Sequence, residues 1–153
     1  MKKSIFYYLF AVVCTVCLFT ACSDDDDDDN NKALTVDNIV GTYTGTLDVM
    51  ETSILNTPIS VAKVSDSKVV IELKDFTFDS IPVGDIAVEC TVKANGDKLD
   101  INGAGTVTIA ALGNATLPVS VAGDSNGKKL DIDITITSIP LVGDLKVEYE
   151  GTK

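Results

Sequence analysis

The chain has 153 residues, enough for one domain with tails, and carries 23 acidic residues against 12 lysines and no arginine. Its formal net charge of −11 excludes nucleic acid as an expected partner, because such a surface repels the phosphate backbone. The chain has no histidine, the usual general base and zinc ligand, so we expect no enzymatic activity, no metal site and no cofactor.

The N-terminus has the composition of a secretory signal peptide. Met1–Ser4 carries two lysines, and Ile5–Phe19 is an apolar run broken only by Thr15. A membrane-spanning helix needs roughly 20 apolar residues, so this run is too short to be one. We therefore predict that residues 1–21 are a cleaved leader.

The end of the leader indicates lipid attachment at Cys22. Leu18-Phe19-Thr20-Ala21-Cys22 resembles a lipobox, although Phe19 stands where an aliphatic residue is usual. Ordinary signal peptidase cleavage after Ala21 would place bulky Phe19 at position −3, where a small residue is preferred. We predict that acyl chains on Cys22 anchor the protein to a membrane, and the alternative is a soluble mature chain.

Residues 22–35 form the expected tether. Six aspartates, Asp24–Asp29, repel one another and cannot pack, so this segment is predicted to be extended and disordered. The run after Cys22 resembles the acidic export signal of surface lipoproteins in Gram-negative gut anaerobes. The resemblance implies an outer membrane lipoprotein exposed at the cell surface, and the alternative faces the periplasm.

Residues 36–153 are predicted to be an all-β domain. Apolar and polar residues alternate through segments such as Leu130–Thr137, which is typical of strands buried on one face. Eight strands are expected, at 39–50, 57–64, 68–78, 83–94, 98–110, 115–122, 128–138 and 143–151. A bulge near Lys74-Asp75 would place Phe76 and Phe78 on the same face as the preceding apolar residues.

Turn signals separate these strands. Asn95-Gly96-Asp97 and Asp124–Gly127 suit tight hairpins, Ser65–Ser67 is a weaker signal, and Pro82 and Pro140 are expected in two further loops. A hairpin unit repeated along the chain favours a meander. Eight meandering antiparallel strands with one apolar face predict an up-and-down β-barrel, and the alternative is a β-sandwich.

The opening of this domain carries a family resemblance. Ile39–Val49, "IVGTYTGTLDV", begins an eight-stranded domain behind a lipobox and an acidic tether. It resembles the calycin-like β-barrel lipoproteins of gut anaerobes over roughly Val36–Lys153. Gly41-Thr42-Tyr43 is also similar to the G-x-W motif of lipocalins, with Tyr43 in place of tryptophan, but the later lipocalin motifs have no counterpart. The resemblance implies a lipocalin-like barrel at the cell envelope and names no substrate.

Aspartates and cysteines bind metals or act in catalysis in other proteins, but in this chain they are expected to have structural roles. Asp124–Gly127 has the start of a calcium loop without its later ligands, which favours a hairpin turn. Asp131 and Asp133 are expected on a solvated strand face. Cys90 falls in phase with apolar neighbours and has no histidine to activate it, which favours a buried core residue.

The functional question is whether the barrel interior is empty. Small eight-stranded barrels are either filled by side chains or hold one small ligand. The residues predicted to line a ligand cavity are Tyr43, Phe76, Phe78, Cys90 and Tyr149. The first hypothesis is a module that binds a small apolar molecule or a glycan, and the second is a filled barrel that acts as a structural or protein-interaction module.

Overall fold

The computed structural model describes residues 33–153. The predicted signal peptide, Cys22 and the aspartate run lie outside the described residues. Leu34–Lys153 forms a compact unit, and Leu34 at its start packs against the core. In this part of the chain, no helix has the length and apolarity needed to cross a membrane.

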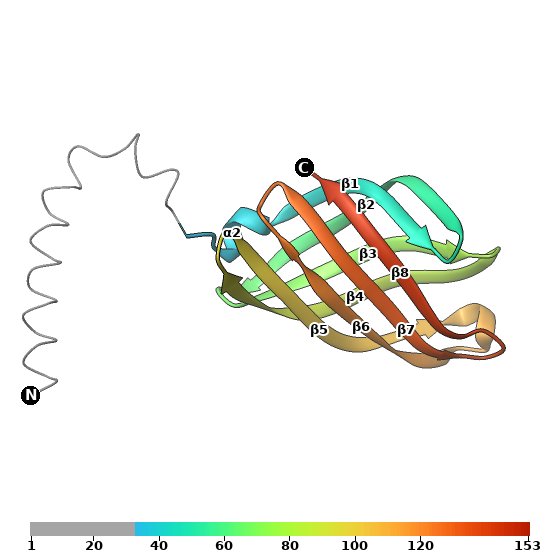
Figure 1. Ribbon diagram of the computed structural model, residues 1–153. Helices are drawn as coiled ribbons and strands as arrows, with labels where there is room; N and C mark the ends of the chain where they lie inside the picture. Colours follow the sequence, from blue (N-terminus) through green and yellow to red (C-terminus); the bar gives the residue numbers. More distant parts are fainter. Residues whose placement is uncertain (1–32) are drawn as a thin grey trace, which may run out of the picture. The chain divides into compact units, whose positions relative to one another are not determined.

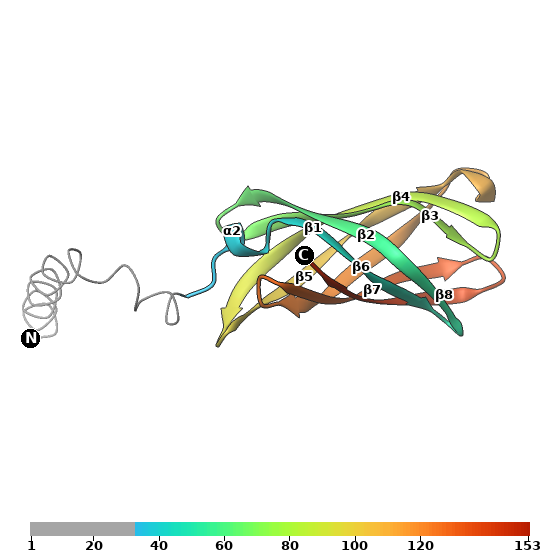
Figure 2. The same ribbon diagram turned by 90° about the horizontal axis from the view of Figure 1, so that it is seen from above.

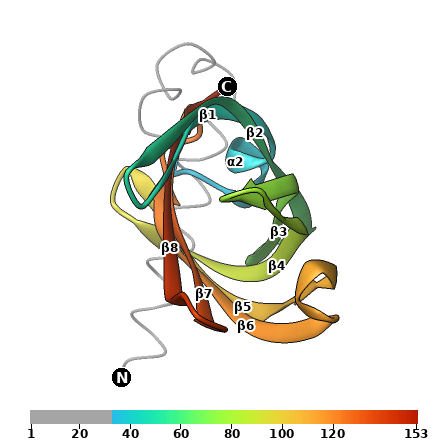
Figure 3. The ribbon, with the colours of Figure 1, turned by 90° about the vertical axis from the view of Figure 1, so that its right-hand side faces the viewer.

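Eight antiparallel strands form a closed barrel in which each strand pairs with its neighbours in sequence and β8 pairs with β1 (Figures 1 and 3). The strands are β1 (Gly41–Val49), β2 (Thr52–Ser65), β3 (Lys68–Phe78), β4 (Ile81–Asn95), β5 (Lys98–Ile109), β6 (Ala115–Ser125), β7 (Lys129–Ile139) and β8 (Gly143–Thr152). The up-and-down barrel predicted from the sequence is confirmed, and the β-sandwich alternative is wrong.

Some strand limits differ from the prediction. The first strand begins at Gly41 because the preceding residues form a short helix, α2 (Val36–Ile39), which is too short to show a helical period. β2 begins at Thr52 instead of residue 57, because Thr52 pairs with Val49 directly across the turn. Pro82 lies within β4 and not in a loop, whereas Pro140 lies in a turn as expected.

The bulge expected in the third strand is present. The register of β3 against β4 shifts between Leu73 and Phe76, and Asp75 has a positive φ of 51°. The extra residue returns Phe76 to the inner face, where it is buried. Phe78 then lies half-buried on the same side, near the end of the strand.

The interior of the barrel is filled by side chains. Its core consists of buried, inward-facing valine, isoleucine and leucine residues with a few aromatic rings, whereas Gly105, an inward-facing position of β5 nearer the end opposite α2, is exposed. A hole large enough for a water molecule would leave solvent-accessible area on the side chains that surround it. Most of the described interior therefore has the packing of a solid core, which is the filled state of a small barrel.

One end of the barrel, the closed end, is covered by α2 (Figure 2). Val36 and Ile39 of this helix are buried, and the Tyr43 hydroxyl donates to the Ile39 carbonyl at 2.9 Å. The same hydroxyl lies 3.3 Å from the hydroxyl of Ser125, a buried polar residue of β6. Tyr43 of β1 therefore links the helix to β6.

Lys153 covers Tyr43 from outside. Its ammonium lies 5.2 Å from the centre of the tyrosine ring and donates to the carbonyls of Asn38 at 2.8 Å and Val40 at 2.6 Å. Partial burial lowers the pKa of this lysine. The sequence pattern does not single out this residue, which reaches the aromatic ring of the first strand from the far end of the chain and forms a cation–ring contact.

Ser125 is the centre of the closed-end network. Its hydroxyl donates to the Lys129 carbonyl at 2.7 Å and accepts from the Gly127 amide at 3.2 Å, and both contacts hold the turn between β6 and β7. Gly127 has a φ of +88°, and a Cβ atom at this position would lie 3.3 Å from the Asn38 carbonyl oxygen and 3.4 Å from Leu34. The turn thus supports the helix that closes the barrel.

We predict that Ser125→Ala lowers the free energy of unfolding by about 1–3 kcal/mol, because it leaves the buried partners of the hydroxyl unpaired. Urea unfolding followed by circular dichroism measures this change. Ser120→Ala is the matched control, because Ser120 lies on the exposed face of the same strand and is expected to change stability by less than about 0.5 kcal/mol. Equal effects of the two substitutions would contradict the role of the network.

Candidate functional site

The other end of the barrel, the open end, has four hairpin turns at residues 50–51, 79–80, 110–114 and 140–142. The ladders that join neighbouring hairpins, β2–β3, β4–β5 and β6–β7, all stop short of this end. The ladder between β2 and β3 runs only from Ser65 and Lys68 to Ser60 and Glu72. Beyond this point, Thr52–Ile59 pairs with β1 and Leu73–Phe78 pairs with β4. The hairpins β1–β2 and β3–β4 therefore diverge toward the open end.

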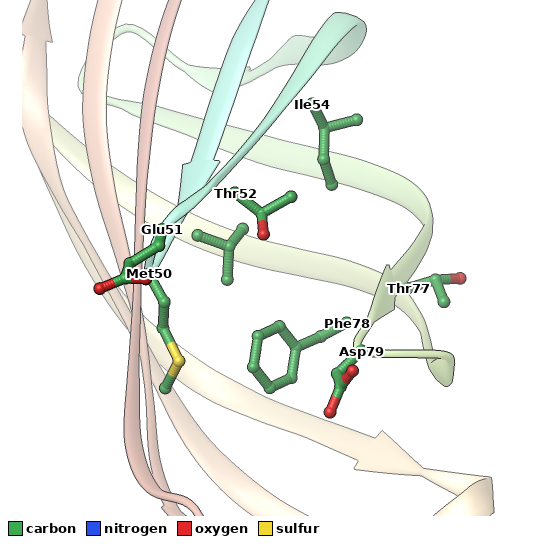
Figure 4. Close-up of a pocket in the computed structure, with 8 residues that line it drawn as sticks. Met50, Glu51, Thr52, Ile54, Thr77, Phe78 and Asp79 are labelled. Atoms are coloured by element: carbon green, nitrogen blue, oxygen red, sulfur yellow. The ribbon is translucent and has the colours of Figure 1, made fainter.

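A pocket of about 490 Å³ lies between the two diverging hairpins. β1, β2 and their turn supply Val49, Met50, Glu51, Thr52 and Ile54, and the end of β3 and its turn supply Thr77, Phe78 and Asp79. The Phe78 ring points into this space toward Met50 and Thr52 (Figure 4). The size lies within the range of small-molecule sites, which are about 300–1,000 Å³.

The pocket combines an apolar wall with an acidic rim. Val49 is buried and Phe78 half-buried, whereas Ile54 is 37% and Met50 63% exposed to solvent. Exposed apolar side chains of this size usually mark a contact surface when they gather in one place.

The two acidic residues of the rim come from the two hairpin turns. Glu51 follows Met50 in the turn between β1 and β2, and Asp79 lies in the turn between β3 and β4. Within residues 33–153, neither carboxylate forms an ion pair with a lysine. The rim therefore has a negative charge that the described part of the chain does not balance.

A second, smaller cavity of about 290 Å³ shares Met50 with this pocket. Its other lining residues are Asp48, Asp144, Glu148 and Lys146. Lys146 already pairs with Glu148 at 2.8 Å and with Asp133 at 3.4 Å, on the outer face of the barrel. An acidic cavity thus lies beside the apolar pocket, with the Met50 side chain between them.

The five residues predicted to line a ligand cavity do not gather at one place. Phe78 lines the open-end pocket, and Phe76 is buried in the same strand, two residues away. Tyr43 lies at the closed end, and Cys90 lies in the core opposite Gly103 of β5. Tyr149 is also buried, and its hydroxyl reaches across β1 to the Thr57 carbonyl of β2 at 3.0 Å.

Burial changes the acid–base behaviour of the core groups. It raises the pKa of the Cys90 thiol to about 11 and that of the Tyr149 hydroxyl to about 12. It also raises the pKa of Tyr43, against the opposing effect of the Ser125 hydrogen bond. All three groups are therefore protonated at neutral pH and packed in the core, which is unfavourable for a nucleophile.

The aspartates considered in the sequence lie on the barrel exterior. Asp124 pairs with Lys98 at 3.0 Å at the closed end, and its strand leads into the turn between β6 and β7. Asp131 and Asp133 point outward from β7. Among residues 33–153, no group of three or more His, Cys, Asp or Glu side chains is arranged to hold a metal ion.

Most of the pocket was not predicted from the sequence. Val49 and Ile54 line the pocket because β2 separates from β3, and this separation is a feature of the three-dimensional strand pairing. Met50 and Glu51 lie in a turn, and Asp79 lies in another. One signal was present: an apolar pair, Ile54-Leu55, lies in a segment that the strand prediction left outside any strand.

Three comparisons with known proteins add to this geometry. The family model of the calycin-like beta-barrel domain matches residues 39–152. No curated protein matches the chain. A crystal structure from Bacteroides fragilis NCTC 9343, described as a "putative outer membrane protein", is similar with a TM-score of 0.55 and 18% sequence identity.

That similarity covers 77% of this chain and 52% of the Bacteroides protein. The chain therefore spans about half the length of that protein. At 18% identity, the similarity shows a shared fold and nothing about a shared ligand.

We predict that Cys90 of the native protein does not react with a thiol reagent at pH 8, because the side chain is buried and only about one thiol in a thousand would be ionised. Labelling with iodoacetamide, followed by mass spectrometry, measures this. The same protein in 8 M urea should be labelled fully. Cys90→Ala/Thr91→Cys is the matched control, because Thr91 is exposed on the outer face of the same strand. Labelling of native Cys90 as fast as this control would show that the thiol is accessible.

Proposed function

The chain belongs to the family of calycin-like β-barrel domains, and on that premise we propose that it is a non-enzymatic, lipid-anchored binding module of the cell envelope. The proposed binding site is the open-end pocket. The ligand is a small molecule with an apolar part that enters between the hairpins β1–β2 and β3–β4. The filled interior supports a site at the mouth instead of one deep in the barrel.

The observation that carries this proposal is the apolar pocket of about 490 Å³ that contains the Phe78 ring. The half-buried Phe78 ring lies beside Val49 and Ile54. A ligand that removes the apolar surface of this ring from water is stabilised by about 25 cal/mol for each Å² buried. Because the neighbouring core is filled, the ligand contacts the mouth only. Such a shallow site favours a small ligand or one end of a larger one.

The proposed location follows from the sequence features before the barrel. Acyl chains on Cys22 would hold the protein at a membrane, and the aspartate run would extend above the headgroups. The similarity to a protein described as a "putative outer membrane protein" supports an envelope location, and the proposed exposure of an outer membrane lipoprotein at the cell surface rests on the aspartate run after Cys22. The alternative orientation faces the periplasm.

The proposal of a non-enzymatic role rests on the side chains that the chain offers. The sequence has no histidine, and the single described cysteine is buried with a raised pKa. The pocket is lined by apolar, hydroxyl and carboxylate side chains, and its lining includes no histidine, cysteine or lysine.

A second candidate function is a protein-interaction module, and the turn between β7 and β8 favours it. Leu141 is fully exposed at 108%, and Val142 beside it is 37% exposed. Apolar residues at a hairpin tip suit a contact with another protein more than contact with water. This candidate needs no ligand in the pocket.

We predict that the neutral fluorescent probe N-phenyl-1-naphthylamine binds residues 34–153 saturably, and that Ile54→Glu weakens binding at least about tenfold. The substitution places a charge on the apolar wall of the pocket, and a fluorescence titration measures the dissociation constant. Leu55→Glu is the matched control, because Leu55 is the next residue of β2 and lies outside this pocket. No saturable binding would favour the protein-interaction module, and equal losses in both variants would place the probe elsewhere.

We also predict that Cys22 is acylated in the natively expressed protein. Intact mass spectrometry should show a chain that begins at Cys22 and carries fatty acyl groups. Cys22→Ala should abolish the lipid mass and release the protein from the membrane fraction. A native chain that begins elsewhere without acyl groups would contradict the anchor.

A further inference from the structure

The two ends of the barrel differ in charge. Each end comprises its turns with the four strand residues on either side, and the closed end also comprises α2, the last four residues of β8 and Lys153. The closed end has seven lysines and seven carboxylates: Lys63, Lys68, Lys93, Lys98, Lys128, Lys129 and Lys153, with Asp37, Asp66, Asp97, Asp100, Asp124, Asp131 and Glu150. The open end has five carboxylates and one lysine: Asp48, Glu51, Asp75, Asp79 and Asp144, with Lys146.

Ion pairs reinforce this difference. At the closed end, Lys63 pairs with Asp37 at 2.9 Å and with Asp66 at 3.0 Å, and Lys129 pairs with Glu150. At the open end, the lysine is occupied by Asp133 and Glu148 on the outer wall. Within residues 33–153, none of the five open-end carboxylates has a lysine partner. The open end therefore has a negative potential that the closed end lacks.

This potential coincides with the apolar pocket. Glu51 and Asp79 lie on opposite sides of the pocket, one from each hairpin turn, and the Phe78 ring lies between the two hairpins (Figure 4). The acidic cavity lined by Asp48, Asp144 and Glu148 adjoins through Met50. An apolar wall next to unpaired carboxylates complements a molecule with an apolar body and a positive group, and the ring face also attracts a cation.

We propose that the open-end pocket selects small cationic amphiphiles, with the apolar body against Val49, Ile54 and Phe78 and the positive group near Glu51 and Asp79. This inference rests on the proposed function and names the chemical class of its ligand. An anionic amphiphile such as a fatty acid is disfavoured, because its carboxylate would lie near like charges. The preference is electrostatic, so salt weakens it.

Displacement of N-phenyl-1-naphthylamine from residues 34–153 at pH 7 tests the inference. The competitors octylammonium, octanol and octanoate have chains of the same length and different head-group charges. Octylammonium should displace the probe at about fivefold to tenfold lower concentration than octanol, and octanoate should be the weakest. The difference between octylammonium and octanol should shrink in 0.5 M sodium chloride.

A pair of double variants locates the charges responsible. In the variant Glu51→Gln/Asp79→Asn, the concentrations of octylammonium and octanol that displace half of the probe should agree within about twofold, because both rim carboxylates have been neutralised. Asp97→Asn/Asp131→Asn removes the same charge at the closed end and should keep the preference of the native protein.

The outcomes separate this inference from the proposed function. Probe binding without a preference for octylammonium would overturn the inference and leave the proposed function standing. Loss of the preference in both double variants would attribute it to the net charge of the chain and would also overturn the inference. Failure of the probe to bind would overturn both.

Discussion

The pairing of β8 with β1 is the constraint on which the rest of the structure depends. Six residue pairs, from Thr44 and Thr152 to Val49 and Val147, join the last strand to the first and remove the free edges of the sheet. A sheet closed in this way has one inner and one outer face, so an alternating sequence sends every second side chain inward. Because those side chains are mostly branched and aliphatic, they fill the barrel. Because most of the interior is filled, the proposed ligand is placed at an end of the barrel.

The two ends of the barrel therefore differ in structure. At the closed end, α2, Tyr43, Ser125 and Lys153 form a connected set of hydrogen bonds and one cation–ring contact, with balanced charges around them. At the open end, β2 and β3 part beyond Ser60 and Glu72, which leaves a pocket in place of a ladder. The closed end is held by these contacts, while the separated hairpins carry the apolar and acidic groups of the proposed binding site. Residues that bind are commonly found on loops held by such a scaffold.

Local patterns predicted most of the fold and little of the site. Alternation predicted eight strands, and the phase break predicted the bulge at Asp75, because both depend on neighbours in sequence. The start of β2 was missed because Thr52–Thr57 contains Asn56, which has a positive φ, and precedes Pro58, so the segment resembles a loop. Lys153 was missed because it meets Tyr43 from the far end of the chain. The pocket depends on where β2 and β3 separate, which no local pattern encodes.

The central claim is that the barrel is filled and that ligands contact only its mouth. Methyl-detected NMR of residues 34–153, titrated with N-phenyl-1-naphthylamine, tests this claim directly. We expect chemical shift changes at Val49, Ile54 and their neighbours in the open-end pocket, and none at the buried core methyl groups of Val61, Ile101 and Leu130. Shift changes that extend through these core residues toward Tyr43 would show that the ligand enters the barrel, and would contradict the account.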